Sequence, residues 1–451
     1  MKKSLALVLS LAVTNLLLAG RPVARWDVIP YQKAEGVFKV GVVAFHEAGV
    51  KVVFSVNGKK VWKTSKATRN DRTGVVEYVF PFDPSKYKDG PVTIGATVTT
   101  EGEKPVELPE LPLYANARKS LPVQKTIWVA PKKGNDYGKG TEADPVESIK
   151  RAVLLAGDGG TVYLTPGTYS IKQIGGGKSR KYWTTIAPAP GVSREEVKVS
   201  GGRSGTDKLK FVNLNVHTEA EGDDNRALAY GEGGETSVWF DNCELSNLGG
   251  RNSGNTRPFA NGMRAFLTGG VTHDMTHGPR CELARGHEVR DVAGEAFSGG
   301  DTLVVNCRAR GIDSEGVVTI EPSLYQAFAN EPNWIENVIL YNVKAEDCKA
   351  SAILGRQLRN SAFVNVTFSP AEDSSFSTEF KEGIENVIFA RVDLGAQTWW
   401  WVRTATNVGN VRPDDVRLFA SKAAVFRDAD LASGVKVAEE CDILCFPKGE
   451  K

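Results

Sequence analysis

The residues best suited to chemistry include three histidines that lie close together in a chain of 451 residues, at His273, His277 and His287. His273 and His277 belong to Gly269–Pro279, a glycine-bounded segment that reads GGVTHDMTHGP. Because an imidazole titrates near neutral pH, either histidine could act as a general base. Their spacing would also suit a metal ion if the segment were helical. The alternative is a polar loop that carries ordinary solvated histidines.

Two pairs of acidic residues are further candidates. Asp313 and Glu315 would share one face of a strand, because alternate strand residues point the same way, and could work as a pair. Asp223 and Asp224, in the phrase EGDDNRALAY, are typical of the paired acids of glycoside hydrolysis or of a Ca²⁺ ligand pair. An Asp-Asp-Asn run is also common in turns. Ca²⁺ at Asp223 and Asp224 is the one cofactor that we predict.

Arginines complete the set of candidates. We predict that Arg285 is catalytic, together with the residues already named, His273, His277, Asp313 and Glu315. The predicted substrate-binding arginines, which would anchor a glycan, are Arg251, Arg257, Arg264, Arg308 and Arg310.

The charge of the central segment limits its partners. Between Phe211 and Val343 there are nine arginines, no lysine and nineteen aspartates plus glutamates, a formal charge of −10. This excess disfavours nucleic acid and repels uronates and sulfated glycans. The absence of lysine excludes a lysine base if the groove lies in this segment. Two interpretations remain. Either Ca²⁺ bridges an acidic polysaccharide to the carboxylates while an arginine or histidine removes a proton, or two carboxylates hydrolyse a neutral glycan.

A repeated phrase of short strands would position these residues. Each copy places a turn residue, usually asparagine, before an apolar or cysteine position. The turn positions are Asn213, Asn242, Gly286, Asn306, Asn342, Asn365 and Arg391, at intervals of 20 to 44 residues. Asparagine and glycine tolerate the left-handed backbone of a sharp bend, and stacked asparagines can hydrogen-bond along the stack. The repeat predicts an all-β fold, a right-handed parallel β-helix.

Residues 126–169 combine a strand, a glycine-rich turn, a short amphipathic helix at Asp144–Ala156 and the phrase PGTY. This arrangement resembles the opening segment of the pectate-lyase-like β-helix superfamily. The resemblance implies that the helix covers the open end of the coil and protects its edge. The phrase VWFDNCEL looks like the Trp-x-Asp-His element of pectate lyases, with Asn242 in place of the histidine. The other catalytic patterns of the superfamily are absent as a set, so no mechanism is carried over.

In folds of this kind, strands on one face of the coil form a groove. We predict groove strands near Arg226–Tyr230, Asn261–Phe266, Glu295–Ser298, Glu315–Ile320 and Ala352–Gly355. Two long loops, Gly249–Pro258 and Gly269–Pro279, would flank this face. Insertions on one face of a solenoid usually mark its working side.

The pattern divides the chain into four parts. Residues 1–20 have a charged start and an apolar core too short to span a bilayer, which predicts a signal peptide. Residues 23–116 alternate as short strands, with an Asn57-Gly58 hairpin turn, and resemble bacterial immunoglobulin-like modules. Residues 124–411 hold the coil and its cap, and 412–451 would close the far end. We therefore expect a secreted, periplasmic or cell-surface protein without a transmembrane segment.

The cysteines of an exported protein can form disulfides but need not. Cys243 and Cys307 fall on the same inward position, two coils apart by this alignment. That separation is about 10 Å, too far for a disulfide, so we interpret them as small apolar fillers. Cys441 and Cys445 could pair near the C-terminus.

Two function classes fit these observations. The first is an exported carbohydrate-active enzyme, a polysaccharide lyase or glycoside hydrolase, acting on an extracellular polysaccharide in the groove. The second is a non-catalytic cell-surface or adhesion protein that binds glycans. No pattern in the sequence indicates an oligomeric state. New unsaturated-uronate absorbance or new reducing ends would favour the enzyme, and glycan binding without turnover would favour the adhesion protein.

Overall fold

The fold is that of a computed structural model, which describes residues 20–46, 48–122, 124–171, 174, 179–203, 207–219, 225–230, 236–259, 263–313, 322–327, 334–371, 378–393, 399–401, 416–419 and 436–438. The predicted signal peptide lies outside these residues, apart from Gly20. Within them, no helix is both long and apolar enough to cross a membrane.

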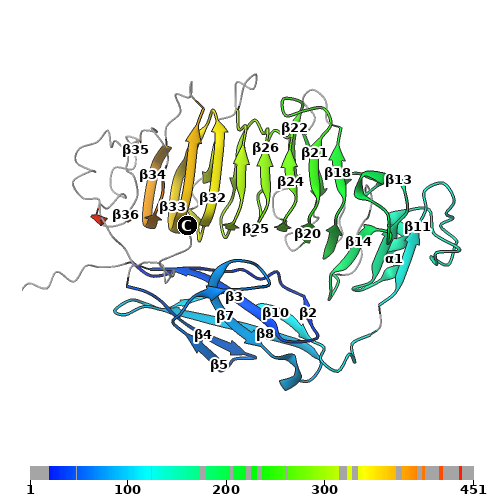
Figure 1. Cartoon of the computed structure of the whole chain (residues 1–451), viewed down its shortest axis with the longest axis horizontal. Coiled ribbons are helices and arrows are strands. Elements are labelled where there is room, and N and C mark those ends of the chain that lie inside the picture. Colours follow the sequence, from blue (N-terminus) through cyan, green and yellow to red (C-terminus); the bar gives the residue numbers. More distant parts are fainter. Residues whose placement is uncertain are drawn as a thin grey trace, which may run out of the picture.

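The N-terminal strands form a sandwich of two sheets (Figure 1). One sheet has the order β1-β3-β7-β6, with bounds Val23–Trp26, Phe38–Phe45, Val76–Phe82 and Thr68–Arg69. The other has the order β2-β10-β8-β4-β5, with bounds Lys33–Ala34, Leu111–Ala115, Gly90–Thr99, Lys51–Val56 and Lys59–Thr64, and β9 (Val106–Glu107) pairs with β8. Alternate residues of β4 and β8 fill the space between the sheets. The expected sandwich is present, and its immunoglobulin-like assignment stays a prediction.

From β11 onward the chain winds into a right-handed parallel β-helix with three faces (Figure 1). The first face contains β11 (Thr126–Val129), β12 (Thr161–Leu164), β14 (Thr184–Pro188), β17 (Leu209–Val212), β20 (Ser237–Asp241), β23 (Arg264–Thr268), β25 (Leu283–Arg285) and β28 (Leu303–Val305). The second face contains β13 (Gly167–Ser170), β15 (Val197–Ser200), β18 (Asn215–Thr218), β21 (Glu244–Asn247), β24 (Val271–His273), β26 (Glu288–Arg290) and β29 (Arg308–Arg310). The third face contains β16 (Gly202–Arg203), β19 (Asn225–Tyr230), β22 (Asn255–Phe259), β27 (Glu295–Ser298) and β30 (Ser323–Ala327).

The last described coils have longer strands that run through the corners between faces. They are β32 (Ile339–Cys348), β33 (Ser351–Pro370) and β34 (Thr378–Ala390), with short β31 (Ile335–Glu336) and β35 (Trp399–Trp401) beside them. In the segment predicted to close the far end, β36 (Val416–Phe419) and β37 (Lys436–Ala438) continue the parallel pairing of β34. The described part of that segment therefore extends the coil.

Residues with left-handed backbone form the corner between the first and second faces. They are Asn213, Asn242, Gly269, Gly286, Asn306, Asn342, Asn365 and Arg391, with φ between 51° and 62°. Asparagine side chains bond along this column, Asn342 to Asn306 at 3.0 Å and Asn365 to Asn342 at 2.8 Å. The predicted asparagine column is confirmed. Gly269 adds a coil that the repeat missed, so the interval of 44 residues from Asn242 to Gly286 spans two coils.

The position after each corner points into the coil, as predicted. Cys243 and Cys307 occupy it, and the coils between them place Gly270 and His287 there. The two cysteines are therefore three coil steps apart, because the missed coil lies between them. The cysteines that the structure describes are free and buried. Cys441 and Cys445 lie outside the described residues.

A single short helix covers the open end of the first coil. It is α1 (Ile149–Ala156), which begins later than the predicted Asp144 because Ser148 is its N-cap: the Ser148 hydroxyl accepts a hydrogen bond from the Arg151 N–H at 3.2 Å. Residues just before it are extended, and Val146 bridges Val129 of β11. The helix residues buried against the coil are Ile149, Ala152, Val153 and Ala156.

The sandwich packs along the first face of the coil (Figure 1). Val23, Val43 and Phe45 of the sandwich belong to one buried cluster with outward residues of the first face, among them Phe266, Leu283, Leu303 and Tyr341. The rings of Phe45 and Tyr341 meet edge to face, with centroids 5.3 Å apart. The first face is therefore apolar on both sides and is closed to a polymeric ligand.

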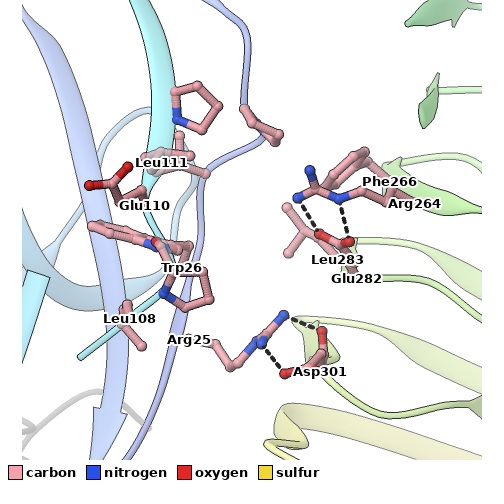
Figure 2. Close-up of a pocket in the computed structure, with 14 residues that line it drawn as sticks. Arg25, Trp26, Leu108, Glu110, Leu111, Arg264, Phe266, Glu282, Leu283 and Asp301 are labelled. Atoms are coloured by element: carbon pink, nitrogen blue, oxygen red, sulfur yellow. Dashed lines mark hydrogen bonds and ion pairs between the residues drawn. The ribbon is translucent and has the colours of Figure 1, made fainter. Parts of the chain in front are cut away.

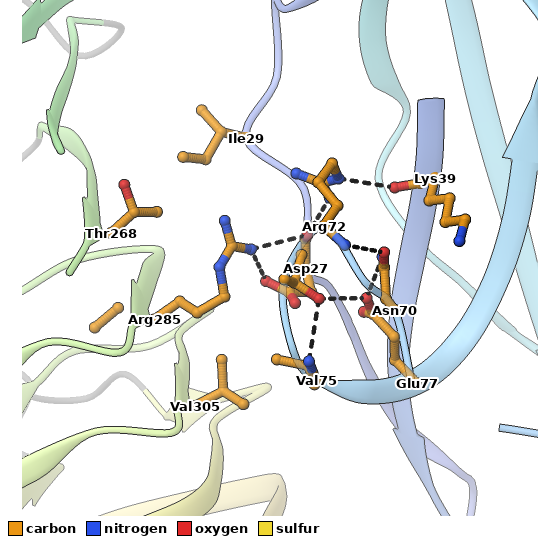
Figure 3. A network of polar contacts seen from close by, with 12 residues as sticks. Asp27, Ile29, Lys39, Asn70, Arg72, Val75, Glu77, Thr268, Arg285 and Val305 are labelled. Atoms are coloured by element: carbon orange, nitrogen blue, oxygen red, sulfur yellow. Dashed lines mark hydrogen bonds and ion pairs between the residues drawn. The ribbon is translucent and has the colours of Figure 1, made fainter. Parts of the chain in front are cut away.

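A buried ionic network crosses this interface (Figure 3). Asp27, which follows β1, is fully buried. Arg285, at the end of β25, donates to the Asp27 carboxylate and, at 3.3 Å, to its backbone carbonyl, which Arg72 also contacts at 3.2 Å. Buried Glu77 accepts a hydrogen bond from Asn70 at 2.7 Å. Burial raises the pKa of both carboxyl groups, and at Asp27 the Arg285 guanidinium opposes that rise.

Asn342 offers a test of the corner column, because it donates to Asn306 and accepts from Asn365. Asn342→Ala removes both hydrogen bonds and places a non-glycine residue without a polar side chain in left-handed backbone, so we expect a loss of about 2–4 kcal/mol in the free energy of unfolding. Asn342→Gly also removes the hydrogen bonds, but glycine adopts left-handed backbone without strain, so the free energy of unfolding should fall by about half as much. Urea denaturation measures both, and equal losses would contradict the backbone contribution.

Arg285 tests the interface. Arg285→Ala leaves the buried Asp27 carboxyl without its hydrogen-bonded ionic partner, with only Arg72 still nearby, so we expect a loss of about 3 kcal/mol in the free energy of unfolding, measured by chemical denaturation. Arg257→Ala, which removes an arginine from the open third face, serves as the matched control and should cost less than about 1 kcal/mol. Comparable losses in the two variants would show that the Asp27–Arg285 contact does not stabilise the interface between the sandwich and the coil.

Candidate functional site

The third face remains open where three successive coils meet. They contribute β22, the segment His277–Arg280, and β27. The His277 N–H donates to the Thr256 carbonyl at 2.9 Å, and the Gly278 N–H donates to the Glu295 carbonyl at 2.7 Å. Because adjacent parallel strands lie about 4.8 Å apart, outward side chains of these coils can touch one another.

Buried threonines fix the loop that carries His277. Thr256 and Thr276 exchange hydrogen bonds, each backbone N–H donating to the other hydroxyl, at 3.1 and 3.0 Å. At Gly278 an added Cβ would lie 2.1 Å from the Ala296 carbonyl oxygen, so the backbone passes too closely for any side chain. His277 is therefore held between a locked threonine pair and a tightly packed glycine.

His277 and Glu295 form a hydrogen-bonded pair. His277 Nδ1 lies 2.8 Å from Glu295 Oε2, and the Ser298 hydroxyl donates to Glu295 Oε1 at 3.2 Å. Glu295 is only 8% exposed. Burial alone would raise the pKa of this carboxyl, but His277 and the hydrogen bonds outweigh it and hold the pKa below its usual value. A carboxylate can only accept, so Nδ1 carries the proton, and in the neutral ring Nε2 is the nitrogen that can accept one.

The pair opens into a pocket of about 190 Å³ on the third face. Arg257 and Arg280 line it together with His277, Glu295 and Gln326. Arg257 donates to Asn255 at 2.9 Å, while its buried Nε has no hydrogen-bond partner among the described groups. The pocket thus combines a histidine base, a buried carboxylate that orients it, and two guanidinium groups that could bind an anion.

Two charged residues of this pocket, Glu295 and Arg280, were not among the predicted site residues. The strand Glu295–Ser298 was predicted to lie on the groove, but its acid was passed over for Asp313 and Glu315. Arg280 directly follows the predicted flanking loop. The sequence pointed to both positions, because Glu295 begins a predicted groove strand and Arg280 follows a predicted flanking loop.

One predicted groove strand is wrong. Residues Asn261–Phe266 overlap β23, which belongs to the covered first face. The groove strand just before it is β22, which overlaps the segment interpreted as the loop Gly249–Pro258 and ends at Phe259. Pro258 suggested a loop, but β22 lies at the edge of the three-stranded sheet β16-β19-β22, where a proline costs no ladder hydrogen bond. The predicted Glu315–Ile320 strand lies outside the described residues.

His273 and His277 lie on different faces. His273 ends β24 on the second face, Asp274 turns the corner with φ 54°, and no helix forms, so the spacing considered for a metal ion does not arise. His273 Nδ1 contacts Asp274 at 2.6 Å, and its Nε2 contacts Glu244 at 3.1 Å. The structure therefore leaves His277 without His273 at the third-face pocket.

The remaining predicted acids are only partly described. The backbone of Asp313 forms a parallel β-bridge with that of Lys349 at the start of the third face. The Asp313 carboxylate lies 4.0 Å from the Arg251 guanidinium. Glu315, Asp223 and Asp224 lie outside the described residues. Among those described, no group of three or more histidine, cysteine or acidic side chains is arranged to hold a metal ion.

The predicted arginines distribute over all three faces. Arg257 lines the third-face pocket. Arg251 contacts Asp313 at the start of the third face. Arg308 and Arg310 are exposed on the second face, where Arg310 pairs with Glu288 at 3.0 Å. Arg264 and Arg285 belong to the covered first face, where Arg285 is occupied by Asp27. The structure thus separates Arg285 from the catalytic candidates because its strand faces the sandwich.

The fold agrees with the resemblance to pectate-lyase-like β-helices. No family model and no curated protein matches the chain. Among solved structures, it is similar to a rhamnogalacturonan lyase, with 13% identity, TM-score 0.35, and 70% of this chain and 85% of that chain covered. It is also similar to a pectate lyase, with 13% identity, TM-score 0.33, and 69% and 79% covered. A third is the catalytic unit of a GH87 alpha-1,3-glucanase from Streptomyces thermodiastaticus strain HF3-3, with 12% identity, TM-score 0.32, and 91% and 96% covered.

His287, unlike His277, belongs to the core. It is 1% exposed; its Nδ1 donates to the Gly269 carbonyl at 2.7 Å, and Thr272 Oγ1 lies 2.9 Å from its Nε2. Both contacts suit a neutral ring. Burial lowers the pKa of His287 from its ordinary 6.5 to about 4.

This burial predicts a pH-dependent stability. Between the ordinary value of 6.5 and the folded value of about 4, the unfolded chain binds a proton at His287 and the folded chain does not. The free energy of unfolding should therefore fall as the pH falls through this window, by up to about 3 kcal/mol from this residue. His287→Gln should flatten that dependence in urea denaturation series. Parallel pH curves for the two proteins would contradict the assignment.

Proposed function

We propose that this protein is an exported carbohydrate-active enzyme, a polysaccharide lyase that cleaves a uronate-containing extracellular polysaccharide at the third-face pocket. The observation that carries the proposal is the His277–Glu295 pair beside Arg257 and Arg280. A β-elimination needs a base for the proton next to a carboxyl group and cations that hold this carboxylate. The pocket supplies both. The charged and apolar start of the chain supports export.

The reaction follows from the positions of these groups. His277 Nε2 takes the proton from the carbon that bears the uronate carboxyl group, while Arg257 and Arg280 stabilise the negative charge that then spreads over the carboxylate. The electron pair forms a carbon–carbon double bond, and the bond from the neighbouring carbon to the glycosidic oxygen breaks. The leaving oxygen takes up a proton from water, and the His277 imidazolium then returns its proton to the solvent. Glu295 stabilises the imidazolium through Nδ1.

The local charge of the pocket supports an anionic substrate. The acidic total of −10 between Phe211 and Val343 is a property of the sequence and not of this surface. Among the residues that the structure describes, two arginines and one histidine line the pocket with a single carboxylate, Glu295, which already bonds to His277. Other acids of the segment pair elsewhere, such as Glu282 with Arg264 on the first face. A uronate therefore meets a cationic surface and needs no bridging Ca²⁺ at this point.

The alternative activity is glycoside hydrolysis, which requires two carboxyl groups on either side of the scissile bond. The described pocket lining has one, and Asp313, at the start of the third face one coil beyond Glu295, is the candidate for the second. The other function class is a non-catalytic surface protein that uses the same face to bind glycans.

A substrate panel tests the proposal. Purified protein is incubated with pectic, alginate-type and glucuronate-rich polysaccharides and with neutral glycans, and unsaturated-uronate absorbance and reducing ends are measured. We expect both signals on at least one polyuronate. His277→Ala should lower kcat/KM by about 10²–10⁴-fold because the base is lost. Arg257→Ala should lower kcat as well as raise KM, because this guanidinium both holds the uronate and stabilises the charge that develops on it.

Arg310→Ala, on the second face, is the matched control and should leave activity unchanged. Reducing ends without the absorbance, lost in Asp313→Asn, would identify a hydrolase instead. Saturable glycan binding with neither signal, preserved in His277→Ala, would identify a binding protein. Each of these outcomes contradicts the lyase.

A further inference from the structure

A second cavity lies between the sandwich and the first face of the coil (Figure 2). It has a volume of about 370 Å³ and shares no lining residue with the third-face pocket. Strand β1 and the segment leading into β10 form one wall, and β23, β25 and the corner at Asp301 form the other. Small-molecule sites occur preferentially at such domain interfaces. We call this cavity the interdomain cleft.

The charged groups of the interdomain cleft are two arginine–carboxylate pairs and Glu110. Arg264 forms a forked pair with Glu282, at 2.6 and 2.9 Å, within the coil. Arg25 reaches from the sandwich to Asp301 at 2.8 Å. The Asp301 side chain is 60% exposed and that of Glu282 29%, so a ligand can reach both carboxylates. Asp301 Oδ1 also accepts a hydrogen bond from Asn337 at 3.0 Å. The Arg25 Nε is buried and has no hydrogen-bond partner among the described groups.

Between these pairs the lining is apolar. It includes the Trp26 indole, whose Nε1–H donates to the Pro109 carbonyl at 2.7 Å and so fixes the ring. Leu108 and Leu111 extend this wall, and Phe266 and Leu283 lie opposite on the coil. Figure 2 shows Trp26 and Leu108 on the sandwich side and the Arg264–Glu282 pair facing them.

We infer that the interdomain cleft is a second saccharide-binding site, which takes a neutral sugar of one or two residues. Sugar hydroxyls can donate to Glu282 and Asp301 and accept from the guanidinium groups, while the C–H faces of the ring pack on the apolar lining. The volume lies at the small end of the range for ligand sites, about 300–1,000 Å³. This size suits a mono- or disaccharide and excludes a folded partner.

The charge pattern selects against other ligand classes. An anion would face Glu110, Glu282 and Asp301, and a cation would face Arg25 and Arg264. A purely apolar ligand would strip water from both ion pairs without replacing the hydrogen bonds. A neutral polyhydroxyl molecule leaves both pairs intact and satisfies their free donors and acceptors. This inference depends on the lining of the cleft and does not rest on the chemistry at His277.

Calorimetric titration of the full chain with neutral mono- and disaccharides, and with uronic acids for comparison, tests the inference. We expect saturable binding of at least one neutral sugar. Asp301→Asn and Glu282→Gln should each weaken it about tenfold or more, because a charge-assisted hydrogen bond is lost. Asp301→Asn should not perturb the fold, since Asn337 and Asn360 occupy the equivalent left-handed corners of the next coils. Thermal unfolding of each variant checks this.

His277→Ala and Arg257→Ala are the matched controls, and both should bind the neutral sugar as the wild type does. Sugar binding that is lost in His277→Ala and kept in Asp301→Asn would place the ligand in the third-face pocket and overturn the inference. Binding of uronic acids alone, or no saturable binding to the wild type at millimolar sugar, would overturn it too. Polyuronate cleavage by Asp301→Asn should stay unchanged. Loss of sugar binding and loss of polyuronate cleavage are therefore separate results, and each tests only one of the two proposals.

Discussion

Parallel backbone pairing between successive coils is the interaction on which the rest of this structure depends. Each coil lies about 4.8 Å from the next, so residues at equivalent positions form columns. Left-handed corners such as Asn306, Asn342 and Asn365 turn the chain at the same position in each coil, and their amides bond along the column. The number of residues per coil varies, and the corner column keeps its alignment. The inward positions that follow the corners and the third-face pocket both depend on this pairing between coils.

The three faces acquire different roles because one is covered. The sandwich closes the first face with an apolar cluster and the Asp27–Arg285 contact, while Arg257, His277 and Glu295 meet on the open third face. Charged residues follow the same division. Carboxylates near the sandwich pair with arginines across or beside the interface, and the pocket keeps more guanidinium and imidazole groups than carboxylates. The formal charge of a segment therefore says little about the surface that a ligand meets.

Much of the fold could be predicted from local backbone rules. The asparagine column follows from left-handed corners, and the hairpin at Asn57-Gly58 has φ 49° and 77°, as that dipeptide favours. The coil at Gly269 was missed because a Gly-Gly pair carries no asparagine signature. Strand β22 was missed because Pro258 resembles loop chemistry. His277 and Arg257 were predicted to lie at the site, but its carboxylate was not, since only the stacking of coils brings Glu295 next to His277.

The covered first face could not be predicted because outward apolar residues such as Phe266 and Leu283 look like core residues of any buried strand. The cover has a consequence for how the chain reaches its final form. The sandwich precedes the coil, so its surface at Val23, Val43 and Phe45 can be complete before the long-range parallel contacts exist. Such contacts are slow to form. A folded sandwich would offer each new coil an apolar surface to pack on. The N-terminal module would then act as a template for folding of the coil, as well as covering its first face.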